Sequence, residues 1–240
     1  MMRLDARELD FRALNALLRE TPGDVEIEHC LGQRFIGAGM EGRSLRIHGV
    51  PGNALGAYLN GGEIEVFGSA QDAVGDTMNA GTILVHGSIG DTAGYAMRGG
   101  KLYVRDDAGY RAGIHMKAYR DQVPVLIIGG RAGSFLGEYQ AGGVIVVLGL
   151  YRDPRPIVSN FPCTGMHGGK LFLRGDCREI LFPVQVTARP ASAEDLAEIA
   201  PNLQEFCQVF HLDFASVTDA PFTLVTPDSA NPYRQMYVAN

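Results

Sequence analysis

The sequence predicts an all-β protein: a single-stranded right-handed β-helix (solenoid) of about eight coils with flanking helices. Two observations point to this fold. Glycine accounts for 31 of the 240 residues, about twice the usual share of roughly 7%. Five of these glycines recur every 19 residues, and apolar residues alternate in phase with them. A repeat of this length is typical of solenoids, in which each coil stacks on its neighbour.

Residues 1–24 are expected to form an N-terminal capping helix. Asp5 and Glu8 have the spacing of a capping box, which predicts a helix that begins there and ends at Glu20. Phe11 and several leucines supply an apolar face at helical spacing. The end of a solenoid exposes a strand edge that would otherwise pair with other chains, so we expect this helix to cover it.

Residues 25–180 are expected to form the β-helix, which three glycine ladders define. The ladders are Gly37, Gly56, Gly75, Gly94 and Gly113; Gly49, Gly68 and Gly87; and Gly62, Gly81 and Gly100. A coil this short turns sharply several times. Its corners need backbone conformations with positive φ, which glycine adopts without steric cost.

Apolar residues keep the phase of the glycines and predict one buried strand face in each coil. A second apolar series, here called the methionine stripe, has the same interval. It consists of Met40, Leu59, Met78, Met97 and Met116. Such a series could be mistaken for a cofactor or metal box, but side chains repeated once per coil stack inside a solenoid. The stripe is therefore predicted to be core.

Two segments break the repeat. After Gly113 the register slips by five residues, so His115 to Val123 is interpreted as an insertion that bulges from one coil. Tyr151 to Phe161 is rich in proline and charge and is interpreted as a detour between coils. Between these two segments the repeat resumes, with a strand predicted over Val144 to Leu148. A later copy of the repeat ends at Leu173.

Residues 181–240 are expected to form a helical and extended C-terminal tail. Ser192 and Asp195 have capping-box spacing and predict a helix, which Pro201 should interrupt because proline suits the first turn of a new helix. The last 25 residues contain Tyr233 and Tyr237 among prolines and are expected to be extended. We expect this aromatic tail to dock on a surface of the chain itself or of a partner.

Composition excludes several functions. The net charge of −6 and the pI of about 5.5 remove the electrostatic attraction on which nucleic-acid binding depends. The longest apolar run, Val144 to Leu148, is far too short to span a membrane. The N-terminus carries charges where a signal peptide would need an apolar stretch, so a cytoplasmic location is expected.

The residues that metals prefer are scattered along the sequence. The four cysteines are Cys30, Cys163, Cys177 and Cys207, and the six histidines are His29, His48, His86, His115, His167 and His211. No Cys-x-x-Cys pair is present, which favours buried, reduced thiols. The sequence pattern also shows no His/carboxylate cluster, so metal binding is not expected.

Two patterns could carry chemistry. Val125 to Gly133 resembles a strand that feeds a dinucleotide-binding glycine loop, but the helix that such a loop requires does not follow. Asn53, Asp72 and Asp91 occupy one repeat position and could pair as acid and base. They are also ordinary turn residues, which is the favoured interpretation. The sequence therefore assigns no catalytic, cofactor-binding or metal-binding residue to this chain.

The repeat itself resembles a known family. Gly52-x(3)-Gly56-x(5)-Gly62 and Gly90-x(3)-Gly94-x(5)-Gly100 are similar to the motif of the GXGXG β-helix domain, which closes the C-terminal end of the large subunit of glutamate synthase. The resemblance covers about residues 32–175. Similar domains form one of the chains of formylmethanofuran dehydrogenase, of the related formyltransferase/hydrolase complex and of methylamine–glutamate N-methyltransferase.

The resemblance implies a structural subunit of an oxidoreductase complex in nitrogen assimilation and glutamate biosynthesis. A separate chain of this size resembles the split, archaeal-type glutamate synthase. Its expected partners are the FMN-domain, glutaminase and electron-input subunits, which would hold FMN and iron–sulfur clusters. We expect no cofactor in this chain, no catalysis by it alone, and possible self-association.

Two alternatives stay open. The chain could be the β-helical scaffold of a formylmethanofuran dehydrogenase or formyltransferase/hydrolase complex, or an independent β-helix enzyme that acts on glycans. The absence of tryptophan and the expected cytoplasmic location argue against the second. In either complex, the segments that break the repeat, His115 to Val123 and Tyr151 to Phe161, and the C-terminal tail are expected to contact partners.

Overall fold

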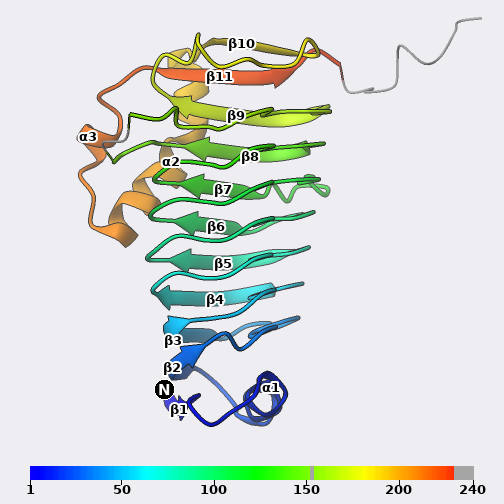
Figure 1. Cartoon of the computed structure of the whole chain (residues 1–240), viewed down its shortest axis with the longest axis vertical. Helices are drawn as coiled ribbons and strands as arrows, with labels where there is room; N and C mark the ends of the chain where they lie inside the picture. The colour runs from blue at the N-terminus through cyan, green and yellow to red at the C-terminus, as the bar shows by residue number, and fades with distance from the viewer. Residues whose placement is uncertain (152–153, 230–240) are drawn as a thin grey trace, which may run out of the picture.

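The computed structural model describes residues 1–151 and 154–229. The strands lie one above another in a single column (Figure 1) and form one 11-stranded sheet in the order β1-β2-β3-β4-β5-β6-β7-β8-β9-β11-β10. The column consists of β1 (Met2–Asp5), β2 (Val25–Leu31), β3 (Ser44–Val50), β4 (Asn60–Phe67), β5 (Ala80–Val85), β6 (Lys101–Val104), β7 (Val125–Ile128), β8 (Ala141–Val147), β9 (Gly168–Arg174), β11 (Phe222–Pro227) and β10 (Val186–Pro190). Strands β1 to β9 pair in parallel, and β2 to β9 each contribute one strand to a coil. The prediction of a parallel β-solenoid of about eight coils is confirmed.

Side chains repeated once per coil stack in the core, as the sequence predicts. Leu45 pairs with Ile64, Ile64 with Ile83 and Ile83 with Leu102 along the sheet, and all four are fully buried. Every member of the methionine stripe is buried as well. Because each coil covers the apolar side chains of the next, the core runs along the column, and burial of this surface stabilises the fold.

Glycine is needed at the corners for two different reasons. Gly56 has φ +63° and lies between Ala54 and Tyr58, which also have positive φ, so positive φ recurs at every second residue of this corner. The other members of the first and third ladders likewise have positive φ. Gly68 does not. There, a Cβ would lie 2.6 Å from the carbonyl oxygen of Gly49, so close approach of the coils requires glycine.

The first break in the repeat begins three residues later than predicted, after Lys117. Lys101 pairs with Val125, so this coil has 24 residues instead of 19. His115 and Met116 keep their repeat positions, and the amide of Lys117 still bonds to the Met97 carbonyl at 3.0 Å. The extra residues follow, and Tyr119 and Gln122 bridge to each other within them.

The second break rejoins the solenoid before its predicted end. Val158 is buried and bridges in parallel to Ala132 of the preceding coil, and Phe161 has the positive φ of a corner residue. Residues 152–153 of this detour lie outside the described residues.

The N-terminal prediction is partly wrong. Helix α1 spans Phe11–Glu20, and its N-cap is Asp10, whose side chain accepts a hydrogen bond from the Ala13 amide at 2.8 Å. Asp5 instead ends β1 and pairs with Arg7. The exposed edge of β2 offers free backbone groups to residues 2–5, and that long-range pairing overrides the local capping signal.

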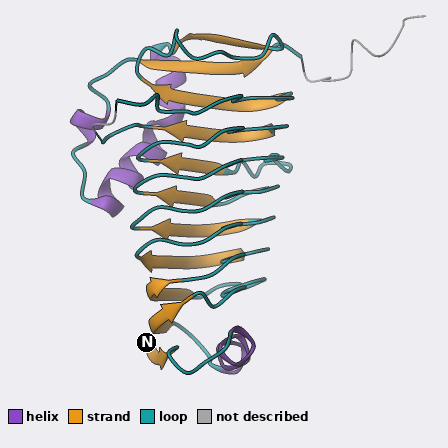
Figure 2. Ribbon diagram, viewed as in Figure 1, coloured by secondary structure: helices purple, strands orange, loops and turns teal. Residues whose placement is uncertain are grey.

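The C-terminal segments close the other end. Strand β11 runs antiparallel to β9, and β10 runs antiparallel to β11. Helices α2 (Ala193–Phe210) and α3 (Phe214–Val217) lie beside the C-terminal half of the column (Figure 2). The capping box at Ser192 and Asp195 is confirmed. The interruption at Pro201 is wrong, because Ile199 and Leu203 on either side of it pack in one core cluster and keep the helix continuous. The predicted tail at Tyr233 and Tyr237 lies outside the described residues.

Candidate functional site

The outer face of the sheet is divided into a covered half and an open half. Helix α2 packs through Leu203, Phe206 and Phe210 on outward-facing residues of β5 to β9, among them Tyr103 and Phe172. On β2 to β4 the outward side chains are exposed or partly exposed. We call this the open face; it consists of Glu26, Glu28, Arg46, His48, Glu63, Glu65 and Phe67, with His86 directly after β5.

A stack of aromatic rings crosses the open face. The rings of His48 and Phe67 are parallel to within 11°, with centroids 4.8 Å apart, and Phe67 stacks on His86 at 5.1 Å. Phe210 of α2 meets His86 edge to face at 5.0 Å. These three ring residues of the sheet occupy one repeat position, so the solenoid interval aligns them. Stacking fixes the plane of each imidazole.

Each histidine of the stack contacts a glutamate of the preceding coil. His48 Nε2 lies 3.1 Å from Glu26 Oε1, and His86 Nε2 lies 3.0 Å from Glu65 Oε1. The second oxygen of Glu26 accepts a hydrogen bond from Arg3 Nε at 2.7 Å. The hydrogen bond from His48, followed by that from Arg3, lowers the pKa of Glu26. Glu26 is therefore an ionised carboxylate at neutral pH.

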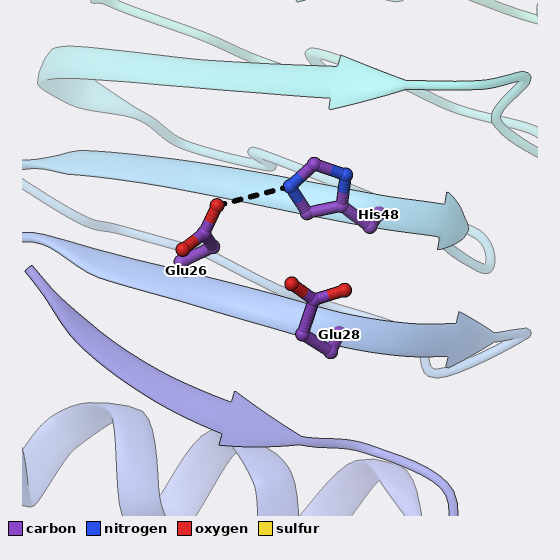
Figure 3. A group of neighbouring side chains, drawn as sticks. All are labelled: Glu26, Glu28 and His48. Atoms are coloured by element: carbon purple, nitrogen blue, oxygen red, sulfur yellow. Dashed lines mark hydrogen bonds and ion pairs between the residues drawn. The ribbon is translucent and has the colours of Figure 1, made fainter.

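A β-bulge adds a second carboxylate beside His48. The register between β2 and β3 shifts between Ile27 and Cys30, so that Glu28 and His29 together oppose one residue, His48. His29 has φ +56°. Ligand atoms of Glu26, Glu28 and His48 all lie within 4.8 Å of one another (Figure 3). The expectation that the chain lacks a His/carboxylate cluster is therefore wrong.

A second exposed surface follows the glycine corners of the central and C-terminal coils. We call it the aromatic corner; it consists of Tyr95, Tyr110, His115, Phe135, Tyr139 and Phe161. His115 stacks on Tyr139 with ring centroids 5.2 Å apart, and Phe161 lies 5.2 Å from Phe135. Phe161 is 63% exposed. His115, which begins one predicted contact segment, and Phe161, which ends the other, therefore each lie in a ring stack at these corners.

A buried charge supports the aromatic corner. The Arg111 guanidinium lies over the rings of Tyr110 and Phe135, 4.7 and 5.1 Å from their centroids. Its Nε donates to Glu138 Oε2 at 2.6 Å, and Glu138 is 7% exposed. The ion pair and the cation–π contacts hold these rings in place.

The segment that resembles a dinucleotide loop is used for coil packing. Val125–Ile128 is strand β7, and its four side chains are buried. A Cβ on Gly129 would lie 2.1 Å from the Arg105 carbonyl oxygen, and one on Gly130 would lie 2.1 Å from Asp107 Oδ1. Both glycines are therefore required by the preceding coil, and a solenoid corner follows them in place of a helix.

The Asn53, Asp72 and Asp91 series binds backbone amides. The Asp72 side chain accepts from the Asp91 amide at 2.9 Å, and the Asp91 side chain accepts from the Tyr110 amide at 2.7 Å. Asn53 makes a longer contact of 3.4 Å to the Asp72 amide. These side chains therefore have the structural role that the sequence favoured. The sequence suggested that each would bond to the backbone of its own turn, whereas each contacts a backbone amide of the following coil.

The four cysteines are free and buried, as predicted. Burial raises the pKa of Cys30 to about 11 and that of Cys163 to about 12. Thiols with such pKa values are protonated at neutral pH and are poor nucleophiles.

Comparisons with known proteins agree with the solenoid. The model of a family described as GXGXG motif matches residues 22–225. An uncharacterized protein of Methanocaldococcus jannaschii is 42% identical over 248 aligned positions, which cover 98% of this chain and 95% of that relative.

The helices within residues 1–151 and 154–229 include none with the length and apolar character that a membrane span requires.

Proposed function

Because this chain belongs to the GXGXG motif family, we propose that it is a non-catalytic structural subunit of a multi-subunit glutamate synthase, which forms glutamate from glutamine. The observation that carries the proposal is the extent of the family match. It runs from residue 22 to residue 225 and so includes every coil of the solenoid. The resemblance implies a structural subunit, and we propose that all coils of the solenoid together brace the catalytic units of the complex.

The physical properties of the column suit a brace. Parallel pairing links β1 to β9 without interruption, and the strands at the two ends, β1 and β10, have only 4 and 5 residues. Short edge strands limit pairing with further copies, so the long side faces of the column are the natural surfaces for partners. The repeated side chains that resemble chemical motifs, the methionine stripe and the Asp72 and Asp91 carboxylates, are engaged in packing or backbone hydrogen bonds.

We assign partner contact to the aromatic corner. Aromatic residues and arginine are enriched at the centres of protein interfaces, where they contribute most of the binding free energy. Phe161 and Tyr139 are exposed, and Arg111 orders the neighbouring rings. The proposed partners are the FMN-domain, glutaminase and electron-input subunits, which would hold FMN and iron–sulfur clusters, in the cytoplasm.

Co-purification tests the proposal. The tagged chain is isolated from its own organism under native conditions, and the chains that accompany it are identified by mass spectrometry. Recovery of FMN-synthase and glutaminase chains, with glutamine-dependent glutamate formation, is the expected result. Recovery of formyltransferase-like chains would assign the column to a one-carbon complex. Recovery of the chain alone would contradict a bracing role.

A further inference from the structure

We propose that Glu26, Glu28 and His48 form a binding site for a divalent transition-metal ion, of which Zn²⁺ is the representative. The three side chains converge at the N-terminal end of the open face, from β2 and the neighbouring β3 (Figure 3). The inference goes beyond the bracing role and does not depend on it, since it concerns a ligand of this chain alone.

The donor atoms suit such an ion. An imidazole nitrogen with carboxylate oxygens is a common ligand set for Zn²⁺, with bond lengths of about 2.0–2.2 Å. At those lengths two ligands of a tetrahedral ion lie about 3.4 Å apart. His48 Nε2 and Glu26 Oε1 are already 3.1 Å apart, and a carboxylate oxygen of Glu28 lies within 4.8 Å of a ligand atom of each of these residues. Three protein ligands leave one position for water.

The surroundings hold two of the ligands in place. Phe67 stacks on the His48 ring and fixes its plane. Arg3 binds Glu26 Oε2, so that Oε1 remains directed at His48 Nε2. Both ligands lie on strands held by neighbouring coils, and sites built on such elements are more precise than sites on loops.

The charge of the group also favours a cation. A metal ion binds carboxylate and imidazole ligands in their deprotonated forms, so this ligand set contributes two negative charges to the complex, which match a divalent ion. Arg3 is 73% exposed at its side chain and contacts the carboxylate oxygen that faces away from His48. Its solvated guanidinium offsets the attraction only in part.

The bulge supplies the third ligand, and the protein contains an internal comparison that lacks it. His86 and Glu65 repeat the His48–Glu26 pair two strands further on, at 3.0 Å. Glu28 lies two residues after Glu26, but the residue two positions after Glu65 is Phe67, which cannot bind a metal ion. Among the described residues, no further metal-ligating side chain is grouped with His86 and Glu65.

Calorimetric titration with Zn²⁺ tests the site. The chain of 240 residues is first freed of metal with EDTA. Wild type is expected to bind one ion, and Glu28→Gln and His48→Gln should each weaken binding at least tenfold. His86→Gln, the matched control, should bind as wild type does. Zn²⁺ should also raise the Tm of wild type and of His86→Gln more than that of Glu28→Gln.

The variants change partly exposed polar side chains, and their metal-free Tm values show whether the fold is intact. Two results would overturn the proposal. One is a wild type that takes up no Zn²⁺. The other is undiminished uptake by both Glu28→Gln and His48→Gln, which would place any bound ion elsewhere.

Discussion

Gln140 stands in the core where the preceding coil has Met116. Its amide bonds to the Gly137 carbonyl just as the Met116 amide bonds to that of Gly113, and its side chain is fully buried in the continuation of the methionine stripe. Gln140 Nε2 donates to the Gly142 and Gly143 carbonyls, at 3.2 Å each. Its Oε1 has no hydrogen-bond partner within the described residues.

Gln140→Met is therefore expected to stabilise the protein. The substitution removes a buried, unpaired acceptor at the loss of the long amide contacts to the Gly142, Gly143 and Lys170 carbonyls, and the net gain should be about 1 kcal/mol in the free energy of unfolding. Urea unfolding measures it. Met116→Gln is the reciprocal control and should destabilise. A Gln140→Met variant less stable than wild type would show that the amide makes an essential contact.

Gly94→Ala and Gly113→Ala separate backbone strain from crowding. Both glycines have φ near +69°, so each alanine should lose about 1 kcal/mol of stability through strain. A Cβ on Gly113 would lie 2.4 Å from Ile145 Cδ1, whereas the nearest atom to one on Gly94 is 3.8 Å away. Gly113→Ala should therefore lose about 1 kcal/mol more. Equal losses in urea unfolding would argue against crowding at this corner.

Stability should decline at alkaline pH because of the buried thiols. Cys30 and Cys163 have pKa values raised to about 11 and about 12 in the folded chain, against about 8.5 for an exposed thiol. Above pH 8.5 the thiols of the unfolded chain lose their protons while those of the folded chain keep them. The free energy of unfolding therefore decreases as the pH rises from 8.5 towards 11–12. Urea unfolding at pH 8 and pH 10 measures the decline.

Replacement of both thiols provides the control for this pH dependence. The Cys30→Ala, Cys163→Ala double variant should be less stable at pH 8 because it leaves cavities in the core. Its further decline between pH 8 and pH 10 should be smaller than that of wild type. A decline as steep as that of wild type would assign the pH dependence to other groups.

Phe161→Ala should weaken partner binding without loss of stability. The side chain is 63% exposed, so its removal should change the free energy of unfolding by no more than about 0.5 kcal/mol. If the aromatic corner is the contact surface, affinity for the co-purified chains should fall at least tenfold. Val184→Ala, at a side chain that is 92% exposed, is the control. Unchanged affinity in Phe161→Ala would place the contact elsewhere.

The sequence predicted the coils well because a solenoid repeats its local environment. Gly56 and Gly75 define the 19-residue interval, and adding this interval to the buried positions of one strand gives those of the next strand from β3 to β6. The features that were missed depend on contacts between distant segments. Pairing of β1 with β2 overrides the Asp5 capping signal, and packing against the sheet carries α2 through Pro201.

The group of Glu26, Glu28 and His48 was missed for a related reason. Glu26 and His48 are 22 residues apart, three more than the repeat, and only the bulge in β2 aligns them with Glu28. The 19-residue register drawn from the glycines begins at Gly37 and does not extend back to this strand. A sequence search that allowed one extra residue in the first coil could have found the group.

The bracing role is best tested in the coupled reaction of the assembled enzyme. Glutamine-dependent glutamate formation is measured with the FMN-synthase, glutaminase and electron-input chains, with and without this chain. If the column is a brace, the separate glutaminase and synthase reactions persist without it, whereas the coupled reaction falls and recovers when it is added. Full coupled activity in its absence would contradict a bracing role.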